Sequence, residues 1–141
     1  MHLRHTLPIM ALTALGACTP RPAPVAAGPD LNVGIASVCT PSDPKLVPGA
    51  VSEATITMSN EGGWCAVRVA ENGHPYALGL LPGRPEHGRA LIRKAGEQTF
   101  LDYVPAAGYT GPDSFTVKLR SATPGEADPS VHVTVMVQPK S

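Results

Sequence analysis

Apolar and polar residues alternate along most of the chain with a period of two. The clearest segment is 131–137, in which four valines are separated by His132, Thr134 and Met136. The same alternation occurs over 115–120, 65–70 and 54–58, and shorter candidate strands cover 31–38, 76–81, 89–93 and 98–104. A period of two places one face of each strand on a core and the other face in water.

Turn-forming clusters separate these segments. Examples are 60–63 (Asn-Glu-Gly-Gly), 72–75 (Asn-Gly-His-Pro) and 123–125 (Thr-Pro-Gly). No segment shows the 3.6-residue repeat of an amphipathic helix. Seven or eight short strands at this spacing predict an all-β domain, built as a two-sheet antiparallel sandwich.

The composition agrees with a β-rich domain and limits its partners. The chain has 141 residues, with 16 prolines and 14 glycines but only one Trp, three Tyr and two Phe. Its core must therefore consist mainly of Val, Ile, Leu and Ala. Formal net charge is zero, and loss of Arg4 with a leader would leave the chain near neutral. This balance gives no electrostatic basis for binding nucleic acid.

The N-terminus carries a targeting signal. Residues 1–5 are polar with one fixed charge at Arg4, 6–14 are mostly apolar, and Leu15-Gly16-Ala17 leads directly into Cys18. The apolar run is too short to span a bilayer as a helix. The segment resembles the bacterial lipoprotein signal. The alternative interpretation is an ordinary secretory leader that is followed by a cysteine by chance. The resemblance implies cleavage after residue 17 and a lipid, palmitate included, on Cys18.

This resemblance predicts the localisation and one partner. Acyl chains on Cys18 would bind the protein to membrane lipid. Thr19, rather than aspartate, follows the cysteine and favours the outer membrane facing the periplasm, with the cell surface or the inner membrane as alternatives. Residues 18–30 then form a lipidated Pro/Ala-rich tether, with four prolines over 19–30 that favour extended polyproline II segments. The folded domain is expected over 31–138.

Assigning Cys18 to lipid leaves Cys39 and Cys65. In an oxidising periplasm, two remaining thiols in a small domain are most simply a disulfide. A metal or redox pair is the alternative, but the chain has no Cys-x-x-Cys, and no histidine stands at ligand spacing nearby. We therefore predict a Cys39–Cys65 bond.

Residues 103–117 contain a dense motif. Tyr103-Val104-Pro105 is followed by Gly108-Tyr109-Thr110-Gly111-Pro112-Asp113-Ser114-Phe115. It resembles the end of bacterial immunoglobulin-like and cadherin-like repeats, which implies an immunoglobulin-like sandwich. The clustered acidic motifs of calcium-binding cadherins are absent, so calcium is not expected. Pro105 should end a strand, Gly108 and Gly111 should permit turns, Asp113 should accept backbone N–H groups, and Tyr109 and Phe115 should enter the core.

Candidate catalytic groups are sparse. His74 and His87 lie beside turn residues, and His132 falls on the outward face of a strand, so each is expected to be solvated. Asp102 and Asp113 flank the motif without a reason for a raised pKa. The sequence contains no nucleophile elbow, zinc-protease helix or phosphate-binding loop. We predict no enzymatic activity, no catalytic residues, no metal and no cofactor.

Two features suggest a binding surface. One is a local basic run made of Arg84, His87, Arg89, Arg93 and Lys94. It is either a binding surface or an ordinary solvated face. Trp64, the single tryptophan, either packs on the disulfide in the core or marks an exposed aromatic edge. Residues Trp64, Arg84, His87, Arg89 and Arg93 are therefore the candidate binding residues.

Together these features predict a lipid-anchored cell-envelope protein with one immunoglobulin-like domain. Its expected role is that of a non-catalytic binding or structural module, with an envelope protein or a glycan as the possible partner. The alternative is an accessory subunit or small periplasmic enzyme with a site that the sequence does not reveal. Clustering of the basic run with Trp64 on one surface would favour binding.

Overall fold

The computed structural model describes residues 34–141. The predicted leader (1–17), the lipid-bearing Cys18 and the tether (18–30) lie outside the described residues. Within residues 34–141 no helix is long and apolar enough to cross a membrane.

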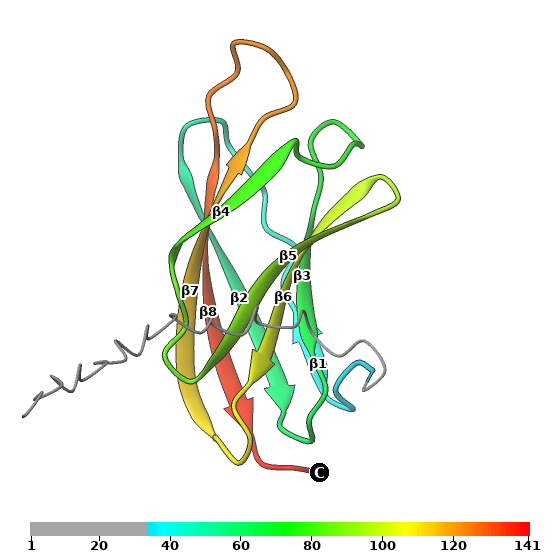
Figure 1. Cartoon of the computed structure of the whole chain (residues 1–141), viewed down its shortest axis with the longest axis vertical. Coiled ribbons are helices and arrows are strands. Elements are labelled where there is room, and N and C mark those ends of the chain that lie inside the picture. Colours follow the sequence, from blue (N-terminus) through cyan, green and yellow to red (C-terminus); the bar gives the residue numbers. More distant parts are fainter. Residues whose placement is uncertain (1–33) are drawn as a thin grey trace, which may run out of the picture.

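The described chain is an all-β sandwich of two sheets, as predicted (Figure 1). The strands are β1 (Cys39–Pro41), β2 (Val51–Ser59), β3 (Cys65–Val69), β4 (Leu78–Gly83), β5 (Gly88–Ala95), β6 (Gln98–Pro105), β7 (Gly111–Arg120) and β8 (Ser130–Gln138). One sheet has the order β1-β2-β8-β7-β4, and the other has the order β3-β6-β5. The chain therefore passes between the sheets several times, which an immunoglobulin-like sandwich requires.

One strand pair departs from the antiparallel prediction. β2 and β8 run parallel, with Val51 opposite Ser130 and Ser59 opposite Gln138. All the other named pairs are antiparallel. A parallel pair needs a long crossover between its strands, and here that crossover is the whole of β3 to β7. Alternation within each strand contains no information about this direction.

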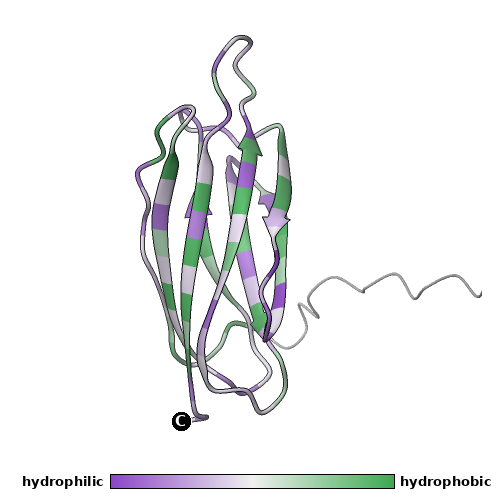
Figure 2. Ribbon diagram, turned by 90° about the vertical axis from the view of Figure 1, so that its left-hand side faces the viewer, coloured by the Kyte–Doolittle hydropathy of each residue, from purple (hydrophilic) through white to green (hydrophobic). Residues whose placement is uncertain are grey.

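The alternating residues face the core as predicted. Val131, Val133, Val135 and Val137 are all buried, and the colour bands along the strands in Figure 2 show the alternation with polar positions. The most buried aromatic residues are Tyr103 and Phe115, whose rings stack with centroids 6.1 Å apart. Tyr109 is only partly buried and packs against the margin of the core, so it enters the core less deeply than Phe115.

The predicted strand at 31–38 is also wrong over its described part. Residues 34–38 form only an isolated bridge between Ile35 and Trp64, and the regular strand begins at Cys39. Gly34 has a φ of 80°, a left-handed conformation that interrupts an extended strand. Its carbonyl accepts the Trp64 backbone N–H at 3.1 Å, which fixes the start of the domain beside Trp64.

The disulfide is confirmed. Cys39 and Cys65 are joined with a Cα–Cα distance of 5.4 Å. Cys39 belongs to β1 in the five-stranded sheet and Cys65 to β3 in the three-stranded sheet. The bond therefore links the two layers of the sandwich.

Candidate binding surface

The 103–117 motif builds one end of the domain through Asp113. Its carboxylate accepts the backbone N–H groups of Glu86 and His87 at 3.0 and 2.9 Å, and the Ser114 N–H at 2.9 Å. It also accepts the hydroxyl of buried Tyr103 at 2.7 Å. The predicted role of Asp113 as a backbone acceptor is confirmed, and it ties the β4–β5 turn to β7. The sequence did not indicate Tyr103 as its partner.

These contacts determine the ionisation of Asp113. Burial opposes the charged carboxylate and is the largest single effect, but the bonds from Tyr103, His87, Glu86 and Ser114 together outweigh it. The pKa of Asp113 is therefore lowered below its ordinary value. Burial and the neighbouring carboxylate raise the pKa of Tyr103 well above its usual range. Both groups thus have structural partners, which matches a stabilising role for this motif.

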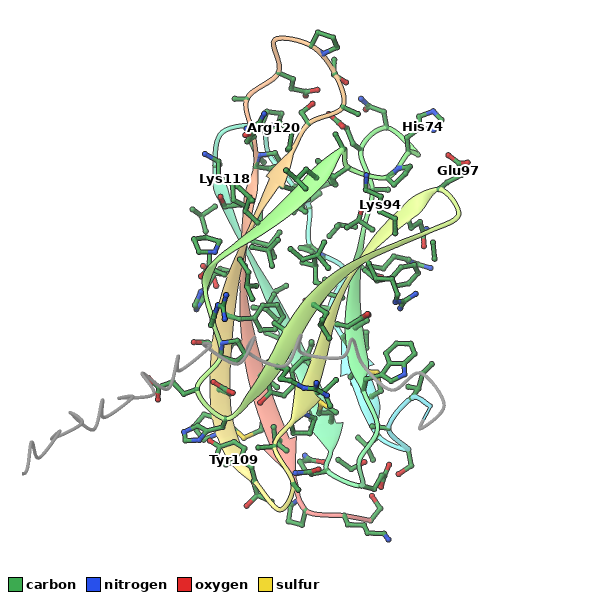
Figure 3. All side chains as sticks on the ribbon, viewed as in Figure 1. His74, Lys94, Glu97, Tyr109, Lys118 and Arg120 are labelled. Atoms are coloured by element: carbon green, nitrogen blue, oxygen red, sulfur yellow. A yellow bond between two sulfur atoms is a disulfide. The ribbon has the colours of Figure 1, made fainter. Side chains whose placement is uncertain are left out.

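The basic run is divided by the fold. Arg84 and His87 lie in the turn between β4 and β5, where the His87 ring stacks on Tyr109 at 4.1 Å between centroids. Lys94 lies at the far end of β5, where its amine donates to the carbonyl of Ala77. Figure 3 shows Tyr109 near the lower end of the domain and Lys94 in its upper half. The basic run is therefore spread along one edge of the domain and not gathered in one cluster, because β5 extends through it.

Arg93 is the member of the run that meets Trp64. Its guanidinium carbon lies 5.2 Å from the centroid of the Trp64 ring and 4.6 Å from that of Phe100. Nε and Nη2 donate to the two carboxylate oxygens of Asp102 at 2.8 and 3.0 Å. The Asp102 side chain is 0% exposed and that of Arg93 is 27% exposed. The arginine is thus held in one orientation at the surface by two rings and a buried carboxylate.

The position of Trp64 decides between its two interpretations. Its ring is half-buried and lies outside the buried core, so the prediction that it packs inside with the disulfide is wrong. Among the described residues, no acceptor bonds its buried indole Nε1. Trp64 lines a shallow groove together with Ile35, Phe100 and Arg68. The aromatic-edge interpretation agrees with this geometry.

Strand register explains why these residues meet. Arg68, Phe100 and Arg93 lie side by side across β3, β6 and β5, because Phe100 pairs with both neighbours. Arg68 and Phe100 alternate with buried residues and therefore face outward, and Arg93 faces the same side because it pairs with Phe100. We call Trp64, Arg68, Arg93, Phe100 and Asp102 the Trp64 face. Sequence reasoning missed Arg68, Phe100 and Asp102 as members, because only sheet pairing brings them beside Trp64 and Arg93.

At the end of the sandwich opposite Asp113, Glu71 is a buried carboxylate that the sequence did not reveal. Glu71 accepts the Ala122 N–H at 2.7 Å and also the Ser121 hydroxyl. Burial opposes its ionisation most strongly, but these bonds prevail and lower the pKa of Glu71. In the same region His74 and Glu97 form an exposed pair at 2.8 Å, which links two loops (Figure 3). Each group has a local structural partner, and this end shows no catalytic arrangement.

The remaining candidates do not converge on a reactive centre. His132 faces outward and its Nδ1 lies 3.0 Å from the Thr116 hydroxyl. Asp102 and Asp113 are committed to Arg93 and to backbone N–H groups, respectively. Within residues 34–141, no three His, Cys, Asp or Glu side chains are placed to hold a metal ion.

Comparison with known proteins adds little to this geometry. No family model matches the chain, and no curated protein matches it. The solution structure of amebosin aligns at 12% identity and a TM-score of 0.39, over 65% of this chain and 100% of that one. The crystal structure of a cysteine protease inhibitor from Entamoeba histolytica aligns at 13% identity and a TM-score of 0.31, over 63% of this chain and 96% of that one. This chain is only distantly similar to both, at a level that supports no functional conclusion.

Proposed function

We propose that this protein is a lipid-anchored, non-catalytic binding module of the bacterial cell envelope, and that it binds through the Trp64 face. The observation that carries the proposal is the Arg93 guanidinium, held between Trp64 and Phe100 by Asp102. An arginine fixed in this way loses little conformational entropy when it binds a partner. Aromatic and arginine side chains also dominate the energetics of protein interfaces.

The charge of this surface favours an acidic protein partner. Arg93 is neutralised by Asp102, whereas Arg68 adds positive charge on the same outward side of the three-stranded sheet. Asp43 is the one carboxylate lining the groove beside Trp64. Two of the five guanidinium N–H groups of Arg93 are used by Asp102, which leaves others to bond a carboxylate. We therefore favour an envelope protein with an acidic surface over a neutral glycan.

The point at which the chain enters the domain supports a partner close to the membrane. Gly34 is hydrogen-bonded to the backbone of Trp64, so a chain leading from a lipid on Cys18 joins the domain beside the Trp64 face. Fifteen residues, 19–33, lie between Cys18 and Gly34. At about 3 Å per residue, an extended segment of this length reaches a few tens of ångströms.

The anchor is tested by Cys18→Ser expressed in a bacterial host. The wild-type protein should sediment with membranes and incorporate labelled palmitate, and the variant should do neither. The substitution removes the Sγ atom on which the thioether would form, so the expected change is nearly complete. A variant that still fractionates with membranes and carries label would rule out the proposed anchor.

The binding surface is tested with a photo-crosslinking residue in intact cells. A crosslinking residue in place of Arg68 should capture a discrete partner. The same residue in place of Thr55, on the outward face of the other sheet, should capture none. A Trp64→Ala variant crosslinked from position 68 should lose at least about tenfold of the product, because truncating a hot-spot tryptophan costs about 2 kcal/mol or more.

Circular dichroism of each purified variant establishes that the fold is retained. Equal capture from positions 55 and 68, or capture unaffected by Trp64→Ala, would argue against the Trp64 face. A crosslinked product whose added mass is removed by glycosidase would identify a glycan instead of a protein.

A further inference from the structure

A second surface lies at the edge of the five-stranded sheet. β4 is the last strand of that sheet, so one edge of its backbone has no neighbouring strand among the described residues. At its start, Lys94 donates to the Ala77 carbonyl, and at its end Pro82 and an irregular register between Leu80 and Gly83 interrupt the ladder. Such devices normally protect a sheet edge from pairing. They leave the stretch from Leu78 to Leu81 open.

This open stretch exposes apolar side chains. Leu78 and Leu80 are 51% and 49% exposed, although most leucines of the domain are buried or half-buried. They face outward because they pair with Arg120 and Lys118 across β7. Between them Gly79 faces inward against Ile92 of β5, where an added Cβ would lie 2.7 Å from two Ile92 carbons. The inner face of β4 therefore packs against β5, while the outward-facing side chains of Leu78 and Leu80 remain uncovered.

An apolar groove continues this surface between β4 and β5. Its lining includes Leu81, Ala90 and Leu91, with Arg84 and Arg89 also present. A strand added beside β4 would place alternate side chains on the leucines and in this groove, because successive side chains point to opposite faces. The groove therefore fits a peptide with alternating side chains.

The charges around β4 are mainly positive. On the neighbouring strand β7, Lys118 lies opposite Leu80 and Arg120 lies opposite Leu78. Lys94 lies at the start of β4. Of these, Arg120 is matched by Asp128 at 3.3 Å. Two copies of this chain pairing through β4 would bring like charges together, which is unfavourable. An acidic segment would instead complement them.

We propose that the open edge of β4 binds an extended acidic peptide segment as an additional strand of the five-stranded sheet. Backbone hydrogen bonds along Leu78–Leu81 would supply affinity, and apolar side chains of the peptide would cover Leu78 and Leu80. Carboxylates on the peptide would pair with Lys118 and Arg84. This site goes beyond the proposed function and does not share its key residues Trp64 and Phe100.

The test uses the full-length chain and a fluorescent, end-capped peptide of eight alternating Glu and Val residues. Fluorescence anisotropy should show saturable binding that weakens as salt is raised. A peptide of identical sequence, N-methylated at alternate amides so that one edge cannot donate, should bind at least tenfold more weakly. Backbone amides of 78–81 should exchange more slowly with solvent when the unmodified peptide is bound.

Two variants locate the site. Arg84→Glu/Lys118→Glu should weaken binding at least tenfold, whereas Lys140→Glu, a change of the same kind on an exposed residue away from β4, should leave it unchanged. Absence of binding, equal binding of the N-methylated peptide or unchanged exchange at 78–81 would overturn the proposal. The proposal would also be overturned if the protein formed a concentration-dependent dimer in which the amides of 78–81 were protected from exchange without any peptide. None of these outcomes affects crosslinking through the Trp64 face.

Discussion

Replacing both Cys39 and Cys65 by alanine lowers the free energy of unfolding by about 3–4 kcal/mol. The disulfide spans 26 residues of sequence, and in the chain-entropy model a loop of this length restricts the unfolded chain by about that amount. It also joins β1, a strand of only three residues, to the buried start of β3. Without the bond, β1 would be held mainly by its pairing with β2.

Urea unfolding followed by circular dichroism measures this effect. The midpoint of the variant should fall well below that of the oxidised wild type, and dithiothreitol should lower the wild-type midpoint to a similar value. The alanine variant itself should not respond to dithiothreitol, which controls for other effects of the reductant. A variant as stable as the oxidised wild type would contradict a stabilising role for this bond.

Asp113→Ala should lower the free energy of unfolding by about 3 kcal/mol. The change leaves the hydroxyl of Tyr103, which is fully buried, without its acceptor, and also frees the backbone N–H groups of Glu86 and His87. Each buried donor left without a partner costs about 1–3 kcal/mol. Asp113→Asn should cost less, since its amide oxygen can still accept some of these bonds.

The Asp113 contribution should also depend on pH. Because the folded pKa lies below the unfolded value of about 3.9, its stabilisation is fully present above the unfolded pKa and is lost as the pH falls through the folded pKa. Urea unfolding between pH 2 and pH 7 should therefore show a smaller acid-dependent loss for Asp113→Ala than for the wild type. Glu86→Ala, which removes an exposed carboxylate of the same turn, is the matched control and should leave the profile unchanged. Identical profiles for all three proteins would exclude this role for Asp113.

Much of the fold could be predicted because the relevant interactions are local or periodic. The alternation of valines over 131–137 specifies a strand with one buried face, whatever it pairs with. Pro105 and Gly108 end and turn the chain by their own backbone geometry, and Gly108 has a φ of 76°. The Cys39–Cys65 pairing followed from the cysteine count once Cys18 was assigned to lipid.

The candidate surfaces could be predicted only in part. Trp64 and Arg93 were both recognised as candidates, but their contact depends on the order β3-β6-β5, which places Phe100 between the two outer strands. Arg84 was grouped with Arg93 because they are close in sequence. The eight-residue length of β5 separates them, since each residue of a strand advances about 3.3 Å.

The amino-acid sequence was enough to predict the period of the strands, the main turns, the disulfide and the composition of the core, because each depends on neighbouring residues or on counting. Only the folded chain reveals the parallel pairing of β2 with β8, the Tyr103–Asp113 bond, the Arg93–Asp102 pair beside Trp64 and the open edge of β4. These features join residues that are distant along the chain or belong to different strands. Their free energies depend on sheet order and register, which a local pattern of apolar and polar residues does not specify.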